Sequence, residues 1–440
     1  MMNLILLSGG SGKRLWPLSN DARSKQFIKI FRKEDGELES MVQRIYRQIK
    51  SVDPEANVTI ATSKSQVSAI CNQLENDIGI SVEPCRRDTF AAIALATAYL
   101  HDIKGISEKE AVVVCPVDPF VEDGYFRCLK SMYEAAKQGK ENLVLMGIEP
   151  TYPSEKYGYI KPTQDIAGNR GYTFTEKPTK EKAEGYIRAG AFWNGGVFAY
   201  KLEYVLKKSR ELLGTNKYYE LLDGYNELKK ISFDYAVVEQ ETSIEVVKYS
   251  GTWKDLGTWN TLTEAMGEHV FGNGILSDTC DNVHVINEMD VPILGMGLHN
   301  LVISASPQGI LVSDKEQSSY IKPFVDNIDQ QIMFAEKSWG YYRVLDVEEG
   351  SMTVKVTLNP GHGMNYHSHE YRDEIWNVIA GNGKTVVDGK ERQVKAGDVI
   401  VLAAGSKHTV VAGKEGIQMI EVQIGKNISI TDKQKYTIQI

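Results

Sequence analysis

The sequence predicts a chain of three parts: an α/β domain with a mostly parallel sheet over residues 1–265, a β-helix-like segment over 266–330 and an all-β barrel over 331–440. Three observations support this prediction. Strand and helix patterns alternate in the first part, short apolar runs recur in the second, and the third is strand-like almost throughout. A length of 440 residues is sufficient for two or three domains.

The α/β prediction rests on patterns that alternate along the first part. Short apolar runs predict buried parallel strands, and the stretches between them predict helices, which is typical of a sheet with helices on both faces. The expected strands are Leu4–Leu7, Asn57–Ala61, Ala111–Cys115 and Asn142–Gly147. The expected helices are Glu39–Lys50, Ala91–His101 and Lys130–Gln138.

The two later parts consist of short apolar runs punctuated by polar turns. In the second part the runs are Val283–Ile286, Val291–Leu294, Leu301–Ser304 and Ile310–Val312. Stacked strands of this kind indicate a β-helix, and an ordinary β-meander is the alternative. From Trp339 onward the runs are Met352–Leu358, Ile375–Ile379, Lys384–Val387, Asp398–Leu402 and Ile417–Ile424. They predict a small barrel or jelly roll.

Charge and composition exclude several classes of protein. The net charge of −8 argues against a nucleic-acid or anionic-membrane partner, so any anion-binding site has to be local. Five cysteines without a CxxC pair are expected to be reduced. No stretch approaches the roughly 20 apolar residues of a membrane span. We therefore expect a cytoplasmic protein.

A glycine-rich turn follows the first expected strand and leads into cationic residues. The stretch SGGSG (8–12) precedes Lys13 and Arg14, and Lys25 follows further on. Backbone N–H groups at the carboxyl end of a parallel strand can cradle a phosphate, and these cations would balance a polyphosphate. The spacing matches neither GxxxxGK[ST] nor GxGxxG. A tight turn with solvated charges is the alternative interpretation.

The wider stretch LLSGGSGKRLWPLS resembles the signature of sugar-1-phosphate nucleotidyltransferases, and LWPLS resembles the mannose-1-phosphate guanylyltransferase branch. Further segments resemble the same family in the same order: EPCRRDTFAAIALA (83–96), PVDPF (116–120), PTYPSEKYGYI (150–160), FTEKPT (174–179), FWNGGVF (192–198) and TWKDLGTW (252–259). The resemblance covers nearly all of residues 1–325. It implies a Rossmann-like, GT-A-like nucleotidyltransferase domain, and the β-helix-like segment also fits this family.

The resemblance implies transfer of GMP from GTP to mannose 1-phosphate, giving GDP-mannose and pyrophosphate. A sugar-phosphate oxygen attacks the α-phosphorus in line, so the protein has to position two polyanions and neutralise their charge. By the same resemblance the catalytic residues are Arg14, Lys25 and Lys177, and the Mg²⁺ ligands are Asp118 and Asp255. The implied nucleotide contacts are Gly9, Gly10, Ser11, Gly12, Lys13, Asp88 and Thr89, and the implied sugar contacts are Tyr157, Gly158, Glu176 and Asn194.

Alternatives to these roles remain open. Read alone, Asp118 and Asp255 are turn or cap residues, and Lys177 is a surface lysine before a proline. The chain departs from the family pattern at Asp88, Pro119 and Gly195, which flank the implied base and sugar sites. One alternative is a nucleotidyltransferase for another NTP or sugar 1-phosphate, and another is a non-catalytic sugar-nucleotide sensor.

A second candidate metal site lies in the C-terminal part. The pair His367-x-His369 predicts two imidazoles on one face of a strand, and Glu374 and His408 would complete a set of three histidines and one glutamate. Such mixed ligands suit Zn, Mn, Fe, Ni or Co. Four polar side chains satisfied by ordinary hydrogen bonds are the alternative. The spacing resembles the two cupin motifs.

This part also resembles the C-terminal phosphomannose isomerase domain that is fused to the same transferase family, through SWGYY (338–342), RDEIW (372–376) and IEVQIG (420–425). That resemblance implies a divalent metal and a base for isomerisation. The family's Gln-x-His is His367-x-His369 here, and Thr409 replaces its arginine. The expected cupin is therefore an active isomerase or a degenerate, structural or regulatory relative. Homodimerisation through the β-helix or the cupin is compatible with the sequence.

Overall fold

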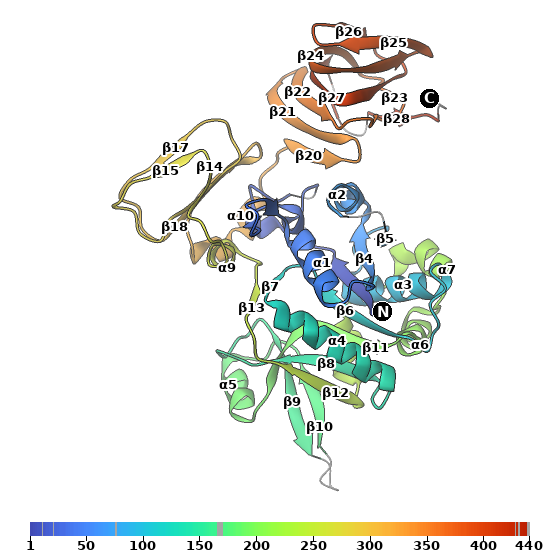
Figure 1. Ribbon diagram of the computed structural model, residues 1–440, viewed down its shortest axis with the longest axis vertical. Coiled ribbons are helices and arrows are strands. Elements are labelled where there is room, and N and C mark those ends of the chain that lie inside the picture. Colours follow the sequence, from blue (N-terminus) through green and yellow to red (C-terminus); the bar gives the residue numbers. More distant parts are fainter. Residues whose placement is uncertain are drawn as a thin grey trace. The chain divides into compact units, whose positions relative to one another are not determined.

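The computed structural model describes residues 1–10, 12–20, 22–74, 77–164, 170–426, 428–429 and 432–437. Within these residues the chain forms two compact units (Figure 1). The first unit comprises residues 1–10 and 26–267, and the second comprises 11–25 and 268–440. The expected domain limits at 265/266 and 330/331 stay predictions.

A nine-stranded sheet forms the centre of the described part of the first unit. Its strands are β1 (Asn3–Ser8), β4 (Asn57–Ser63), β5 (Gly79–Glu83), β6 (Ala111–Pro116), β8 (Leu143–Ile148), β9 (Gly158–Gln164), β10 (Arg170–Thr175), β11 (Phe192–Lys201) and β12 (Ile244–Tyr249). β1 pairs in parallel with β4 and β6, whereas β11 is antiparallel to β6, β8 and β9. Only β10 and β11 run against the other described strands of this sheet, so the prediction of a mostly parallel sheet is confirmed.

Helices cover both faces of this sheet (Figure 1). The helices in the described part of the first unit are α1 (Met41–Val52), α2 (Val67–Gln73), α3 (Asp88–Asp102), α4 (Asp123–Gln138), α5 (Lys180–Arg188), α6 (Leu202–Leu213), α7 (Tyr218–Asp223), α8 (Phe233–Ala236) and α9 (Trp259–Thr263). Leu4 and Leu6 of β1 belong to the core that α1 and α4 share, and Ile5 belongs to the core of α3 and α6. Because side chains alternate along a strand, one apolar run fills two cores.

One helix begins well before the residue that the sequence pattern predicts. α4 begins at Asp123, although the pattern predicts a start at Lys130. Gly124 in its first turn lowers helix propensity, and the aromatic residues Tyr125 and Phe126 are both buried. A glycine beside consecutive buried residues hides the helical period in this turn.

The sequence pattern also missed the antiparallel strands β9, β10 and β11. These strands contain residues that normally signal turns: Gly158, Pro162, Gly171, Gly195 and Gly196. β9 pairs with β10 and with β11, and the pairing of β11 with β8 shifts register between Asn194 and Phe198. Glycines in these strands therefore mark close packing and a bulge rather than a loop.

The second unit contains a stack of short strands. They are β14 (Val270–Gly272), β15 (Gly274–Leu276), β16 (His284–Asn287), β17 (Ile293–Gly295), β18 (Leu301–Ser306) and β19 (Gly309–Asp314). The ladders β14–β16, β16–β18 and β15–β17 are parallel, and only the last ladder, β18–β19, is antiparallel among these described strands. Parallel pairing of successive strands is the arrangement of a β-helix and confirms that prediction, since a meander pairs them antiparallel.

The C-terminal part of the second unit is an antiparallel sheet of nine described strands. They are β20 (Phe334–Lys337), β21 (Gly340–Glu348), β22 (Ser351–Leu358), β23 (His367–Ser368), β24 (Arg372–Val387), β25 (Lys390–Lys395), β26 (Val399–Leu402), β27 (His408–Gly425) and β28 (Gln434–Lys435). Val356, Trp376 and Met419 lie in its core. The all-β prediction is confirmed. β24 joins two runs that the sequence pattern separated, through register shifts near Gly381.

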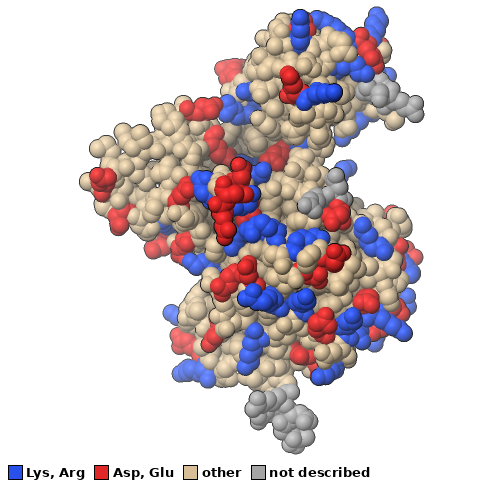
Figure 2. Space-filling model, in the orientation of Figure 1, with Lys and Arg blue, Asp and Glu red and all other residues tan. Residues whose placement is uncertain are grey.

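Cationic and anionic side chains are interspersed on the visible face of the molecule (Figure 2). This distribution accords with the net charge of −8. None of the helices in the described part of the chain is long and apolar enough to cross a membrane.

Candidate functional site

The first two glycines of the turn, Gly9 and Gly10, are exposed at the end of β1. Glu83, the last residue of β5, lies beside them: a Cβ added to Gly9 would be 3.8 Å from Glu83 Oε1. The Tyr225 hydroxyl donates a hydrogen bond to Glu83 Oε2 at 2.6 Å. Burial raises the pKa of Glu83, although the bond from Tyr225 and the charge of Arg86 oppose the increase. One oxygen of the Glu83 carboxylate is thus held by the Tyr225 hydroxyl, while the other lies next to Gly9.

Sequence reasoning did not single out Glu83, although it lies in the quoted stretch EPCRRDT. Its signal was a carboxylate at the carboxyl end of a buried strand, where parallel sheets bind ligands. The predicted contacts Asp88 and Thr89 begin α3, which the pattern had started at Ala91. Asp88 Oδ1 accepts a bond from the Thr89 N–H at 2.8 Å, and Thr89 Oγ1 accepts one from the Phe233 N–H at 2.8 Å. Both side chains therefore support the backbone, and their contact with a nucleotide stays a prediction.

The two predicted magnesium ligands lie at neighbouring positions of one small ladder. Asp118 precedes β7 (Pro119–Val121), and Asp255 ends β13 (Trp253–Asp255). β7 and β13 pair antiparallel with Asp255 opposite Pro119. Both aspartates are half-buried. Two aspartates from distant parts of the sequence thus lie at one end of this ladder, and hard oxygen donors of this kind fit Mg²⁺.

The predicted sugar contacts are brought together by β9, β11 and the end of β10. A Cβ on Gly158 would lie 2.4 Å from Phe174 Cζ and 2.5 Å from Glu176 Oε2, so a larger residue would displace both. Lys177 Nζ lies 2.7 Å from Glu176 Oε1 with 54% of its side chain exposed. The hydrogen bond that Lys177 donates to Glu176 raises the pKa of Lys177 and keeps it cationic. An exposed cation beside a buried carboxylate can receive a sugar phosphate while the carboxylate accepts hydroxyl groups.

Tyr157 connects this region to the strand that carries Asp255. Its ring lies 5.1 Å from the Trp193 ring and 5.3 Å from the Trp253 ring, in both cases edge to face. Burial raises the pKa of Tyr157, so the hydroxyl stays neutral. The aromatic cluster forms a rigid wall next to Asn194 of β11.

The cationic residues that follow the first glycines belong to the second unit. Gly12 has a left-handed φ of 64°, and a Cβ there would be 2.9 Å from the backbone nitrogen of Lys25, so glycine is required. Arg14 is exposed and Lys25 is buried. Lys13 Nζ lies 3.1 Å from Asp326 Oδ1. This ion pair already partners Lys13, whereas the exposed Arg14 is accessible to a ligand.

This segment is anchored on the β-helix of the same unit. The Ser306 hydroxyl donates to the Pro17 carbonyl at 2.8 Å, and Arg23 Nη1 lies 2.7 Å from Glu288 Oε2. These contacts hold the cationic segment at two points, Pro17 and Arg23. The predicted nucleotide contact Ser11 lies outside the described residues.

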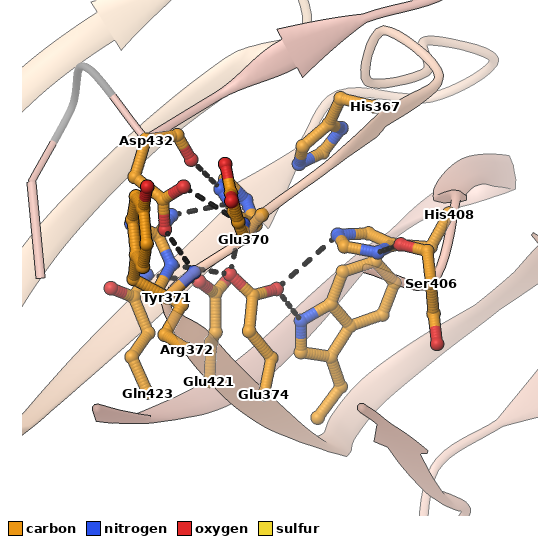
Figure 3. Close-up of polar contacts among 12 residues, drawn as sticks. His367, Glu370, Tyr371, Arg372, Glu374, Ser406, His408, Glu421, Gln423 and Asp432 are labelled. Atoms are coloured by element: carbon orange, nitrogen blue, oxygen red, sulfur yellow. Dashed lines mark hydrogen bonds and ion pairs between the residues drawn. The ribbon is translucent and has the colours of Figure 1, made fainter. Parts of the chain in front are cut away.

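Three buried histidines converge in the C-terminal sheet (Figure 3). His367 lies on β23, His369 follows that strand, and His408 begins β27 opposite His367. One ligand nitrogen from each lies within 4.8 Å of the other two. Three imidazoles at such separations can bind one metal ion together.

Backbone carbonyls orient all three rings. Each Nδ1 faces a carbonyl oxygen, which can only accept, so Nδ1 carries the proton and Nε2 carries the lone pair. The acceptors are Asn365 at 2.6 Å for His367, Ser406 at 2.9 Å for His408, and Asp432 for His369. His408 Nε2 is buried, and its polar neighbour Glu374 Oε2 lies 3.4 Å away, beyond a good hydrogen-bond length. A metal ion would satisfy this nitrogen, so the site fits one.

Glu374 borders two of the three histidines. Its Oε1 lies 3.2 Å from His369 Nε2 and its Oε2 lies 3.4 Å from His408 Nε2. The carboxylate also accepts bonds from Arg372 Nε at 3.0 Å and Trp376 Nε1 at 3.1 Å (Figure 3). Burial opposes ionisation, but His408, His369 and Arg372 together hold the pKa of Glu374 well below its ordinary value. The carboxylate is therefore an anionic donor beside the triad.

The protonation states around the triad suit a metal. Burial, with the charge of Lys433, lowers the pKa of His367 to about 2, and burial lowers the pKa of His369. Neutral imidazoles are the form that binds metals. Burial and the charge of Glu374 raise the pKa of Glu421 to about 8. Sequence reasoning missed Glu421 and Lys433, because nothing in their local pattern places them against the histidines.

Comparison with known proteins gives matches to both parts of the chain. Residues 3–269 match the family model for nucleotidyl transferase, and residues 326–436 match the model for the mannose-6-phosphate isomerase C-terminal domain. A mannose-1-phosphate guanylyltransferase of Salmonella montevideo is 27% identical over 99% of this chain and 99% of its own. The xanthan biosynthesis protein XanB of Xanthomonas campestris pv. campestris (strain B100) is 28% identical over 97% of this chain and 96% of its own. A solved structure of a mannose-1-phosphate geranyltransferase from Thermus thermophilus is 28% identical, with a TM-score of 0.62, and covers 75% of this chain and 99% of that chain.

Proposed function

Because this chain belongs to the nucleotidyl transferase family, we propose that it transfers GMP from GTP to mannose 1-phosphate and releases pyrophosphate. The names of full-length relatives support this choice of substrates. The observation that carries the proposal is the β7–β13 ladder, which places Asp118 and Asp255 at neighbouring positions. Paired carboxylates of this kind would hold a metal ion that supplies positive charge to the phosphates.

The reaction is a single displacement at phosphorus. An oxygen of the sugar phosphate forms a bond to the α-phosphorus of GTP as the bond from that phosphorus to the β-phosphate oxygen breaks. Asp118 and Asp255 would hold Mg²⁺, which supplies neutralising charge at the phosphate oxygens when bound. Arg14 and Lys25 bind the β- and γ-phosphates and balance the charge of the departing pyrophosphate, and Lys177 binds the phosphate of the sugar.

Glu83 supports guanine as the base. Guanine presents two donors on its pairing edge, N1–H and the 2-amino group, and a carboxylate accepts both. Adenine, cytosine and uracil do not present this pair of donors. The Glu83 carboxylate, clamped by Tyr225 and bordering Gly9, provides the required acceptor.

The transferase proposal is tested by Mg²⁺ titration of pyrophosphate release from GTP and mannose 1-phosphate. Asp118→Asn and Asp255→Asn keep the size of each side chain and remove its charge. We expect both variants to lose at least about 100-fold in kcat, the order of magnitude for one preorganised electrostatic group. The exposed Asp278→Asn is the matched control and should behave as the parent chain. Parent-like Mg²⁺ dependence in both site variants would refute the assignment.

The histidine triad favours a second activity for the C-terminal domain. We propose that this cupin holds one divalent metal through His367, His369 and His408, with Glu374 as an anionic neighbour or fourth ligand. When bound, the ion polarises substrate oxygens. Zn, Mn, Fe, Ni and Co all accept this donor set. Isomerisation of mannose 6-phosphate is the corresponding reaction, and a structural or regulatory metal site is the alternative.

Two measurements test the cupin proposal. Metal content of the purified chain should be about one ion, and His367→Ala with His369→Ala should abolish it. His362→Ala is a matched control, because the His362 side chain is exposed and its Nδ1 faces the Pro360 carbonyl rather than the other histidines. Equal metal content in both forms would refute the site. Interconversion of mannose 6-phosphate and fructose 6-phosphate by the metal-loaded chain then separates an isomerase from a structural domain.

A further inference from the structure

The amide of Asn194 is held by two hydrogen bonds. Its Oδ1 accepts from the Gly196 N–H at 3.1 Å, and its Nδ2 donates to Asp234 Oδ1 at 2.7 Å. Asn194 is 8% exposed and lies where β11 breaks register with β8. Gly196 has a left-handed φ of 69°, so the bulge that supplies its N–H depends on glycine. Two independent partners therefore determine which way the amide faces.

Asp234 is itself fixed by the start of the neighbouring helix α3. It lies on α8, whose first turn is capped by the Ser232 hydroxyl accepting from the Tyr235 N–H at 3.3 Å. The Phe233 N–H donates to Thr89 Oγ1 at 2.8 Å. The Phe233 side chain is fully buried, with its ring 4.8 Å from that of Phe198 on β11. These contacts hold α8 against α3 and β11. Asp234, which lies on α8, is therefore held in place as well.

Building on the proposed function, we propose that Asp234 is a positioning residue for the sugar 1-phosphate and acts through Asn194. An amide offers two N–H donors and an oxygen with two lone pairs. Asp234 takes one donor and Gly196 takes one lone pair. One N–H and one lone pair remain, in a fixed orientation, for a hydroxyl group of the sugar. Such a pair distinguishes hydroxyl positions, because a hydroxyl must donate and accept at the same time.

The neighbours of Asp234 place it on the sugar side of the site. The charges of Glu176 and Lys177 both act on its carboxyl group. The Glu176 N–H donates to Glu239 Oε1 at 3.1 Å, so the carboxylate that faces the sugar is supported from the same segment. Asp234 does not need to touch the sugar or the reacting phosphate itself. Its contribution is to prevent the Asn194 amide from rotating.

Steady-state kinetics on the full chain test this role with two substitutions. Asp234→Ala removes the acceptor, and Asp234→Asn retains an oxygen that accepts the same bond. We expect Asp234→Ala to raise KM for mannose 1-phosphate about tenfold or more, with KM for GTP within about twofold of the parent, since one buried hydrogen bond is lost on the sugar side alone. Asp234→Asn should restore the parent KM. The exposed Asp223→Ala serves as the control.

A double-mutant cycle then asks whether Asp234 acts through Asn194. If it does, Asp234→Ala should change the KM for sugar phosphate far less in an Asn194→Ala background than in the parent. Preference for mannose 1-phosphate over glucose 1-phosphate should fall in Asp234→Ala, because an amide free to rotate selects hydroxyl positions less strictly.

Several results would each overturn the inference while the parent chain still releases pyrophosphate. They are an unchanged sugar-phosphate KM in Asp234→Ala, an equal rise in both KM values, and additive effects in the cycle. A failure of Asp234→Asn to restore KM would equally refute a role that rests on the hydrogen bond. Absence of pyrophosphate release in the parent chain, by contrast, refutes the proposed function itself.

Discussion

Glu83→Gln offers the sharpest test of guanine recognition. The substitution keeps the size of the side chain and one acceptor oxygen but removes the charge. In the structure Glu83 Oε2 is clamped by the Tyr225 hydroxyl at 2.6 Å, and Oε1 borders Gly9. In the glutamine variant one of these positions becomes an NH₂ group, which cannot accept from guanine. The loss therefore falls on the contacts made to N1–H and the 2-amino group.

The expected loss can be worked from these contacts. A hydrogen bond to a charged group contributes about 1.5–3 kcal/mol, so losing one such bond should lower kcat/KM for GTP by roughly 10- to 150-fold. ITP lacks the 2-amino group and should lose less. The ratio of kcat/KM for GTP to that for ITP is therefore about tenfold or more in the parent chain and falls toward about one in the variant. The assay is pyrophosphate release at saturating mannose 1-phosphate.

Two controls separate recognition from folding. The exposed Glu134→Gln on α4 makes the same chemical change elsewhere and should leave the ratio unchanged. Tyr225→Phe removes only the clamp and should lower the ratio less than Glu83→Gln does. A Glu83→Gln variant that folds, turns over and keeps the parent GTP-to-ITP ratio would refute the reasoning.

Three further predictions follow from the packing and charge of named residues. Gly158→Ala should raise KM for mannose 1-phosphate and lower the free energy of unfolding by about 1–3 kcal/mol in urea titrations, because its Cβ would displace Phe174 and Glu176; parent-like values for both quantities would contradict this. Burial and the charge of Glu176 raise the pKa of Asp234 from 3.8 to about 7. The folded state therefore holds this proton more tightly than the unfolded state, and stability relative to Asp234→Asn should fall as pH rises from about 4 to about 7, by up to about 1.4 kcal/mol per pH unit; a flat difference in unfolding free energy would refute the shift. His408→Ala should release the cupin metal, measured by elemental analysis, without changing pyrophosphate release, and retention of metal would exclude His408 as a ligand.

Local patterns predicted the elements that are buried on both sides. β1 and β6 are continuous apolar runs, and the side chains that alternate along each strand fill the cores on the two faces of the sheet. The same kind of interpretation was wrong for β9 and β11, where glycine and proline lie at bulges and closely packed positions instead of in turns. Whether a glycine ends a strand or remains inside it depends on its neighbours in space, which a local pattern does not contain.

The candidate site shows the same difference between what local patterns predict and what depends on contacts in space. Family motifs pointed to Asp118 and Asp255, but their neighbouring positions depend on the β7–β13 ladder, which joins distant parts of the sequence. Asp234 had no motif signal, since an aspartate in a one-turn helix is a common cap. Its proposed role rests on its hydrogen bond to Asn194. Charged residues that act by touching substrate are therefore easier to predict than those that hold another side chain.

Pyrophosphate release with Mg²⁺, measured across the four NTPs and a panel of sugar 1-phosphates, tests directly whether this chain transfers GMP to mannose 1-phosphate. We predict the highest kcat/KM for GTP with mannose 1-phosphate, and loss of that activity in Asp118→Asn. A maximum with another pair would contradict the proposed substrates and point to Asp88, Pro119 and Gly195 as the altered positions. Release from no pair would contradict the transferase assignment and favour a protein that only binds sugar nucleotides.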